Sequence, residues 1–389
     1  MHPDHDLPLE DVPYARRERI LAVVLVGVLL AGAWQAVGAW RNPDSIAKVP
    51  KTRADFAEGR TTLALEKQMD KYLPAHERII AFANSIRYLL LRGTGSDVRA
   101  GRDGWLFLTE ELRYDPPKNN PQQQSPLKAR AALLADTHKA LNEQGVRLLV
   151  ALVPDKARVY PHYLLQGQYP DYNAQRYALT LEALRARGVD VVDLLSTFQG
   201  ATAKDGTLYY RTDTHWNQTG AAFAAGAIAS AAFPQGGCSP AARYDTVVAK
   251  RPQPYAGDLR RMIGLEKMPV GFPPRSDMEA PATTTVVEAA ASPGLGLFGD
   301  TSVPVVLAGT SFSLRGNFHG ALQQRFGCTV LNTAQDGGGF LTSITQYLKD
   351  DAFQQSKPQI LVWEVPERFM TQPLDNTEAS FLRDAGLRP

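Results

Sequence analysis

The stretch SPLKARAALLADTHKALNEQGVRLLVALV, residues 125–153, decides the fold. Ser125 suits an N-cap and Pro126 suits the first helical position, so we expect a helix from there to about residue 142. A glycine then ends the helix, and residues 146–153 form an apolar, β-branched run of the kind buried inside a parallel sheet. A helix followed directly by such a strand is the repeating unit of an α/β domain.

The same rhythm continues along the rest of the chain. Helices are expected over residues 173–187 and 219–232, and a short strand over 189–193. Residues 237–300 are rich in Pro and Gly without a dominant period, so we expect an irregular insertion there. Three more apolar strands are expected after it, at residues 303–308, 329–332 and 359–365. The segments between them are long enough for right-handed crossovers, which predicts an α/β fold with a doubly wound parallel sheet.

The N-terminal part of the chain has a different character. Residues 20–40 are almost continuously apolar, broken only by Gln35, and at about 1.5 Å per residue they would span a bilayer core of roughly 30 Å. Three arginines precede this run, which predicts a cytoplasmic tail over residues 1–19 and an extracytoplasmic remainder. A cleaved signal peptide is the alternative, with suitable sites at 31–33 and 36–39. We expect a retained, single-pass inner-membrane anchor, because the run exceeds a usual signal core.

The remaining segments, the net charge and the cysteine count complete the predicted domain organisation and limit the possible partners. Residues 41–100 have apolar residues at helical spacing and predict a helical stalk, residues 101–375 hold the α/β pattern, and residues 376–389 form a C-terminal tail. The net charge of +2 offers no basic footprint, so no nucleic-acid partner is expected. Only Cys238 and Cys328 are available for a disulfide, and the sequence leaves their pairing open.

One of the seven histidines has surroundings typical of an acid–base site. His215 lies in DTHW, residues 213–216, where Asp213 can hold one ring nitrogen and leave the other free as a base. A purely structural Asp–His hydrogen bond is an alternative. A metal site is another, but no second His lies nearby and a catalytic metal needs about three protein ligands. We therefore expect no metal and no cofactor.

The best candidate nucleophile stands in VVLAGTSFS, residues 305–313, where an apolar strand runs straight into Gly-Thr-Ser. A serine at such a strand-to-helix corner is presented at the open edge of the sheet. Its N–H lies near the start of the helix, where negative charge is stabilised. Ser311 fits this position better than Ser313. The alternative is that these hydroxyl residues only cap a helix.

Further candidate residues follow the last two strands. Asn332 ends one of them, and in the TAQDGGGF turn after it the N–H of Gly337 or Gly338 could act as a second oxyanion donor, unless the turn is merely flexible. The final strand runs into WEVPER, residues 363–368, which brings Arg368 to the same edge. Aromatic residues that could stack on a sugar, or be buried instead, are Tyr209, Tyr210, Trp216, Phe340 and Trp363.

Together these motifs resemble the SGNH hydrolase superfamily, and within it the AlgJ/AlgX-like alginate O-acetyltransferase family. The D-x-H-W pair comes first, followed by the strand-GTS, the glycine turn and WEVPER, which is a circularly permuted order that this family has. Further similarity lies in GRDGWLFL at 101–108, PDKARVYP at 154–161 and AGDLRRM at 256–262. The oxyanion Asn of the superfamily has no clear counterpart near the end of the last strand.

The resemblance implies a Ser311 nucleophile, a His215 general base and an Asp213 that orients it, in a periplasmic enzyme that acetylates exopolysaccharide hydroxyls through an acyl-enzyme. Because acetyl-CoA is cytoplasmic, it also implies a membrane-bound O-acyltransferase as acetyl supplier, beside other exopolysaccharide-complex proteins. The polysaccharide acceptor is not named by these residues, since alginate and cellulose both offer hydroxyls. A carbohydrate acetylesterase and a non-catalytic polymer-binding scaffold are the alternatives.

Overall fold

A computed structural model of the chain divides it into two compact units. The smaller consists of Met1–Ala100 and Arg260–Arg275, and the larger of Gly101–Leu259 and Ser276–Pro389. Besides scattered helical residues between 22 and 34, the structure describes residues 52–57, 59–64, 76–113, 125–201, 203–233, 238–239, 241–288, 303–378 and 380.

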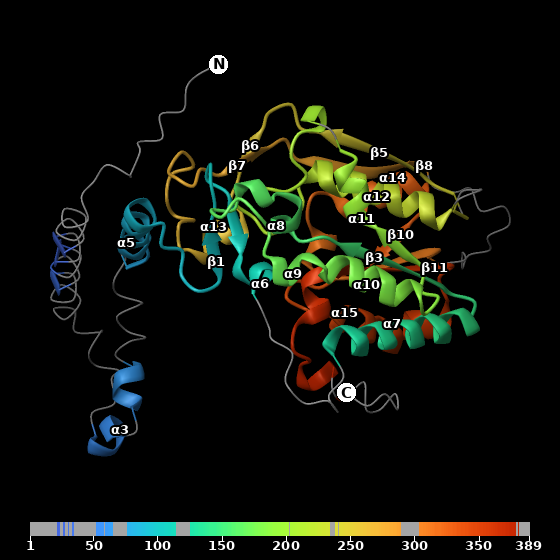
Figure 1. Cartoon of the computed structure of the whole chain (residues 1–389), viewed down its shortest axis with the longest axis horizontal. Coiled ribbons are helices and arrows are strands. Elements are labelled where there is room, and N and C mark those ends of the chain that lie inside the picture. The colour runs from blue at the N-terminus through green and yellow to red at the C-terminus, as the bar shows by residue number, and fades with distance from the viewer. Residues whose placement is uncertain are drawn as a thin grey trace. The chain divides into compact units, whose positions relative to one another are not determined.

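The larger unit is built on a five-stranded parallel sheet with the order β10-β9-β11-β3-β4. Figure 1 labels β3, β10 and β11 of this sheet. Its strands are β3 (Arg147–Val153), β4 (Val191–Asp193), β9 (Val305–Ala308), β10 (Val330–Asn332) and β11 (Ile360–Pro366). All neighbouring strands run parallel. Strands β9 and β11 are buried at every residue and β3 at all but its first, which explains their continuous apolar sequences. The predicted α/β fold with a parallel sheet is confirmed.

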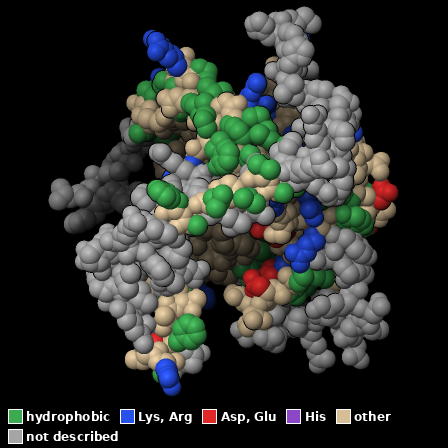
Figure 2. Space-filling model, turned by 90° about the vertical axis from the view of Figure 1, so that its left-hand side faces the viewer, with side chains coloured by type: hydrophobic (Ala, Val, Ile, Leu, Met, Phe, Trp, Pro, Cys, Tyr) green, Lys and Arg blue, Asp and Glu red, His purple; other side chains and the backbone are tan. Residues whose placement is uncertain are grey.

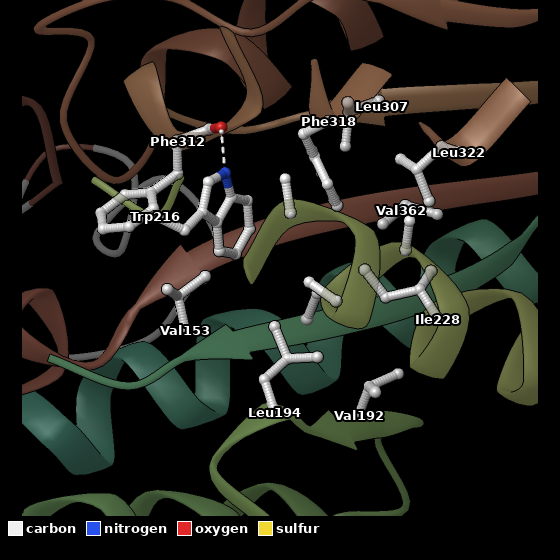
Figure 3. Close-up of a cluster of buried hydrophobic side chains, with 14 of the residues drawn as sticks. Val153, Val192, Leu194, Trp216, Ile228, Leu307, Phe312, Phe318, Leu322 and Val362 are labelled. Carbon is white, nitrogen blue, oxygen red and sulfur yellow. Dashed lines mark hydrogen bonds between the residues drawn. The ribbon is translucent and has the colours of Figure 1, made fainter. Parts of the chain in front are cut away.

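Helices cover both faces of this sheet and bury a core on each. Alternate residues of β3 enter the two cores, with Leu149 and Ala151 in one and Leu148 and Val150 in the other. The first core, seen in Figure 3, packs against α11 (Leu194–Gln199), α12 (Gln218–Ala232) and α14 (Phe318–Phe326). The second packs against α7 (Pro126–Glu143), α10 (Arg176–Arg185), α15 (Thr342–Lys349) and α16 (Asp351–Gln355).

Shorter elements complete the larger unit. They are β2 (Leu106–Leu108), α6 (Thr109–Leu112), α8 (Lys156–Val159), η2 (Pro161–Tyr163), α9 (Asp171–Ala174), η3 (Ala203–Asp205), η4 (Ser311–Leu314) and η5 (Glu367–Thr371). Of these, η4 follows β9, α8 follows β3 and η5 follows β11. The edge predicted to bind ligands is therefore lined by single turns of helix.

The insertion expected to be irregular is an ordered structure where it is described. Strand β5 (Arg243–Val248) pairs with β8 (Ala282–Glu288), and β6 (Gln253–Tyr255) pairs with β7 (Asp277–Glu279), both antiparallel. Helix α13 (Asp258–Met262) follows β6. The expectation was wrong because β6 and β7 are only three residues long and β6 contains a proline, so the two strands leave no periodic pattern. We call residues 241–259 and 276–288 the insertion arms.

A disulfide joins Cys238 to Cys328 and answers the question that the sequence left open. Cys238 comes shortly after α12, and Cys328 lies between α14 and β10. Both residues are buried in the first core. The bond therefore fastens the start of the insertion to the main sheet.

The smaller unit is largely helical where it is described. It contains α3 (Arg53–Ala57), a helical segment at residues 60–64, α5 (His76–Leu91) and β1 (Val98–Ala100). The stalk over residues 41–100 stays a prediction. Within the described part of the chain, no helix is both long enough and apolar enough to cross a membrane. The predicted anchor at residues 20–40 lies, apart from scattered positions, outside the described residues, as does the tail at 1–19.

Candidate active site

The three side chains predicted to form a triad lie in one hydrogen-bonded line. His215 Nε2 is 2.7 Å from Ser311 Oγ, and His215 Nδ1 is 2.6 Å from Asp213 Oδ1. Asp213 and His215 are buried, whereas Ser311 is partly exposed, so the line opens to solvent at its hydroxyl end. This arrangement lets an imidazole take the proton of a hydroxyl while a carboxylate stabilises the resulting cation.

The loop that carries the candidate nucleophile is held by a buried carboxylate. Glu364, on β11, accepts hydrogen bonds from the Thr310 N–H at 2.7 Å and from the Ser313 hydroxyl at 3.1 Å. The Thr310 hydroxyl donates to the same group. A side chain at Gly309 would place its Cβ 2.6 Å from Glu364 Oε2, so only glycine fits there. Glu364 thus pins the Gly-Thr-Ser turn and positions Ser311.

The backbone around Ser311 leaves one amide for a substrate. Gly309 N–H donates to the Ser343 hydroxyl, and Thr310 N–H to Glu364. Behind them, Phe312 N–H and Ser313 N–H donate to the side chain and the carbonyl of Thr310. Across the ranges that the structure describes, the Ser311 N–H has no acceptor. It is therefore available for an oxyanion that forms at its own hydroxyl.

The glycine turn lies beside this loop, but the donor expected from it is used elsewhere. Gln335 N–H donates to the Gly309 carbonyl at 3.1 Å, which joins the turn to the nucleophile loop. Gly338 N–H donates to the Gln335 carbonyl at 3.3 Å and closes the turn on itself. The prediction of Gly338 as second oxyanion donor is therefore wrong. Gly337 is exposed, with a φ of 69° that favours glycine.

Asn332 and Arg368 both lie close to the loop, Asn332 partly exposed and Arg368 buried. The Asn332 side-chain amide donates to the Ser313 carbonyl at 3.0 Å, so it supports the loop from the end of β10. Arg368 is buried, with its guanidinium carbon 5.6 Å from the centre of the Phe312 ring and its Nε 3.5 Å from Glu110 Oε2. Their part in substrate binding stays a prediction.

All five aromatic residues that were candidates for sugar stacking are buried. Trp216 is fully buried, and its indole N–H donates to the Phe312 carbonyl at 3.0 Å (Figure 3). The prediction that Trp216 contacts substrate is wrong, because the side chain is buried and its only polar group is bonded to the backbone next to Ser311. Tyr210 is buried as well and donates to Glu279 Oε2 at 2.6 Å. Burial also accounts for Tyr209, Phe340 and Trp363.

Residues of the insertion arms surround the carboxylate of Asp213. Its Oδ2 accepts the Asp258 N–H at 2.8 Å and the Tyr255 hydroxyl at 3.2 Å, while Oδ1 faces His215. Burial alone would raise the pKa of Asp213. The hydrogen bonds from the ring and backbone of His215 and from Asp258 outweigh it and hold that pKa well below its usual range. Asp213 is therefore a stable anion next to the imidazole.

Two more carboxylates of the arms hold the loop before His215. Asp277 accepts the N–H of Arg211 and the N–H of Thr212, both at 2.9 Å, and the Thr212 hydroxyl at 2.6 Å. Asp258 Oδ1 accepts the N–H of Thr214 at 2.7 Å. Sequence reasoning missed both residues. The only signal was indirect, since Asp258 lies in AGDLRRM.

Asp258 also adds a third metal-ligand type of group to the Asp213–His215 pair. Oxygen or nitrogen atoms of the three residues lie within 4.8 Å of one another. Three of the four carboxylate oxygens, however, accept hydrogen bonds from backbone amides, and Asp213 Oδ1 also faces His215 Nδ1. A cation would have to displace those donors. The geometry therefore favours acid–base chemistry over metal ligation.

Charge on the surface is mixed in sign. On the face that Figure 2 shows, Lys and Arg side chains are scattered among acidic and apolar ones. This agrees with the small net charge of +2.

Comparisons with known proteins agree with this fold. The family described as SGNH hydrolase-like domain, acetyltransferase AlgX, matches residues 98–367. The probable alginate O-acetylase AlgJ of Pseudomonas fluorescens is 31% identical over 361 residues, 92% of this chain and 89% of that protein. The O-acetyltransferase domain of Pseudomonas putida AlgJ superposes with a TM-score of 0.60 at 31% identity, covering 74% of this chain and 99% of the domain. Pseudomonas aeruginosa AlgX shares the fold, with a TM-score of 0.55 at 23% identity over 76% of this chain and 67% of that one.

Proposed function

This chain belongs to the SGNH hydrolase-like acetyltransferase family of AlgX, and from that premise we propose that it acetylates hydroxyl groups of an alginate-type exopolysaccharide. One observation carries the proposal. The Ser311 hydroxyl, the His215 imidazole and the Asp213 carboxylate converge within hydrogen-bond distance at the carboxyl end of the sheet. That convergence also disfavours a non-catalytic scaffold, which would not need the three groups in line.

The proposed reaction has two steps that share one base. His215 takes the proton of Ser311 as the hydroxyl attacks the carbonyl carbon of an acetyl donor, and Asp213 stabilises the imidazolium. The leaving group departs with that proton, and an acetyl-serine ester remains. A sugar hydroxyl then loses its proton to His215, attacks the ester and leaves as the acetylated sugar, while Ser311 regains a proton.

Oxyanion stabilisation in both steps is assigned to the Ser311 N–H. This amide has no acceptor in the described part of the chain and sits on a turn that Glu364 keeps rigid. A donor fixed in advance at the site of developing charge needs no rearrangement during the reaction. A second donor is left unassigned, because the Gly338 amide closes its own turn.

We also propose that the domain works in the periplasm, attached to the inner membrane by the predicted helix at residues 20–40. The Cys238–Cys328 disulfide supports an oxidising compartment. Because acetyl-CoA is cytoplasmic, the acetyl group must be handed across the membrane by another protein. A membrane-bound O-acyltransferase, together with other proteins of an exopolysaccharide complex, is the partner that this chemistry requires.

Transfer and hydrolysis can be separated directly, since the same triad would serve an acetylesterase. The purified protein is incubated with an activated acetyl ester and an alginate oligosaccharide, with a cellulose oligosaccharide in parallel, and the sugars are weighed by mass spectrometry. Transfer predicts sugars heavier by one acetyl group, and only in the alginate sample. Free acetate without acetylated sugar would instead identify an esterase, and Ser311→Ala is the blank for both products.

A further inference from the structure

Lys156 is a fully buried lysine that the proposed reaction does not use. It opens α8, directly after β3, and its ammonium donates to three backbone carbonyls. Nζ lies 2.6 Å from the Leu106 oxygen, 2.9 Å from the Arg211 oxygen and 2.8 Å from the Asp213 oxygen. An ammonium has three N–H groups, so each is matched to one carbonyl.

The positive charge of this ammonium is stabilised by aromatic rings and backbone carbonyls rather than by a direct ion pair. The Trp105 and Phe107 rings have their centres 5.1 and 5.3 Å from Nζ, within the range of a cation–π contact. Among the described residues, no carboxylate forms a direct ion pair with Lys156. A buried charge without such a partner is costly unless other groups stabilise it. Its position is therefore set by the three carbonyls.

We propose that Lys156 is a positioning residue for the triad, one that fixes the Arg211–Asp213 backbone against β2 so that the Asp213 carboxylate meets His215. This rests on the proposed function. The clamp acts from inside the domain, whereas Asp277 and Asp258 hold the same loop from the insertion arms. The clamp also connects three sequence motifs, because GWLFL supplies the Leu106 carbonyl, PDKARVYP supplies Lys156 and DTHW supplies the Asp213 carbonyl.

The clamp depends on the charge of Lys156. A neutral amine has only two N–H groups, so its lone pair would face one of the carbonyl oxygens and push it away. Burial lowers the pKa of Lys156 to about 8, against the attraction of four nearby carboxylates from α6, β7, the DTH loop and α13: Glu111, Asp277, Asp213 and Asp258. The clamp is therefore complete below about pH 8 and weakens above it.

The test compares Lys156→Met, which keeps the length of the side chain but not its charge, with Arg130→Met. Arg130, on α7, is also a buried cation and forms an ion pair with Glu378. For both variants kcat and KM for acetyl transfer are measured from about pH 6 to pH 10, with unfolding curves. Lys156→Met should lower kcat about 10²-fold with KM nearly unchanged, since misplacing a catalytic group by about 1 Å costs that much. Arg130→Met should lose stability but keep kcat.

The pH profile provides a readout that a purely structural lysine would not move. Wild-type turnover should fall above about pH 8, and this fall should be absent in Lys156→Met. Equal kcat losses in Lys156→Met and Arg130→Met would overturn the proposal. So would an alkaline fall in turnover that is the same in the wild type and in Lys156→Met. If Lys156→Met does not fold, the wild type alone decides, because turnover that stays level to pH 10 overturns it. Failure of the proposed function is distinct, since then Ser311→Ala would match the wild type.

Discussion

The candidate nucleophile and its candidate base are held by two different kinds of structure. Ser311 ends a buried parallel strand, and its loop is pinned by Glu364 from the neighbouring strand. His215 lies in a tight loop closed by a bridge between Tyr209 and Trp216, and carboxylates of the insertion arms hold that loop through its backbone. The contrast indicates that the sheet positions Ser311, while the arms position the loop that carries Asp213 and His215.

The largest expected effect lies on the sheet side. Ser311→Ala should lower turnover about 10⁴-fold, because no acyl-enzyme can form, and should change the free energy of unfolding by less than about 1 kcal/mol. Ser313→Ala is the matched control, since it keeps the Ser311–His215 hydrogen bond. Acetyl-ester turnover is the measurement. Comparable losses in both variants would mean that the loop, and not the Ser311 hydroxyl, matters.

The second-largest effect concerns the disulfide that joins the start of the insertion to the main sheet. Replacing Cys238 and Cys328 with alanine should reduce the free energy of unfolding by about 2–4 kcal/mol, because the bond restrains the unfolded chain across a sequence separation of 90 residues. Turnover of the folded protein should stay within about twofold, since the contacts around Asp213 do not involve the bond. Urea unfolding of the wild type with and without reductant checks this independently. Identical curves would contradict it.

A smaller effect tests the arms alone. Asp277→Ala removes the acceptor for two backbone amides of the catalytic loop and should lower kcat by about 10- to 100-fold through a displaced His215. Asp245→Ala provides the control, because Asp245 is an exposed residue of the same arms on β5. Its kcat should match the wild type. The arms would lose their assigned role if Asp277→Ala kept full turnover.

The smallest effect concerns buried acids at the carboxyl end of β3. Burial, and the Asp155 charge after it, raise the pKa of Glu111 to about 8, and burial with the Glu367 charge raises that of Asp155 to about 7. The folded state therefore binds more protons than the unfolded state above about pH 4, so the free energy of unfolding should fall progressively as pH rises to about 8. Glu111→Gln should flatten this slope in denaturant titrations. A slope unchanged by the substitution would argue against it.

The sheet could be predicted because burial on both faces leaves a visible run of apolar residues, as in residues 305–308 and 360–365. The insertion arms could not. Their strands are three to seven residues long and largely exposed, so they show no alternation of apolar and polar residues. Paired residues such as Gln253 and Glu279 are also far apart in sequence, so no short hairpin turn marks the pairing.

The candidate triad could be predicted because its residue types and short motifs are distinctive. Asp258 and Asp277 could not, since they act on backbone amides, which every residue has and no side-chain pattern marks. Gly338 was assigned wrongly for a related reason: which amide a turn uses for itself depends on its dihedral angles. Trp216 follows the candidate base His215, yet its indole is buried in the core.

The pairing of β3 with β11 has a consequence for the order in which the protein assembles. These adjacent central strands are about 200 residues apart in sequence, so the sheet cannot close until nearly the whole domain has been synthesised. Strand β11 also carries Glu364, which holds the loop of Ser311. A partly synthesised chain therefore has Ser311 without the support of Glu364, and the candidate triad is complete only when the last strand docks.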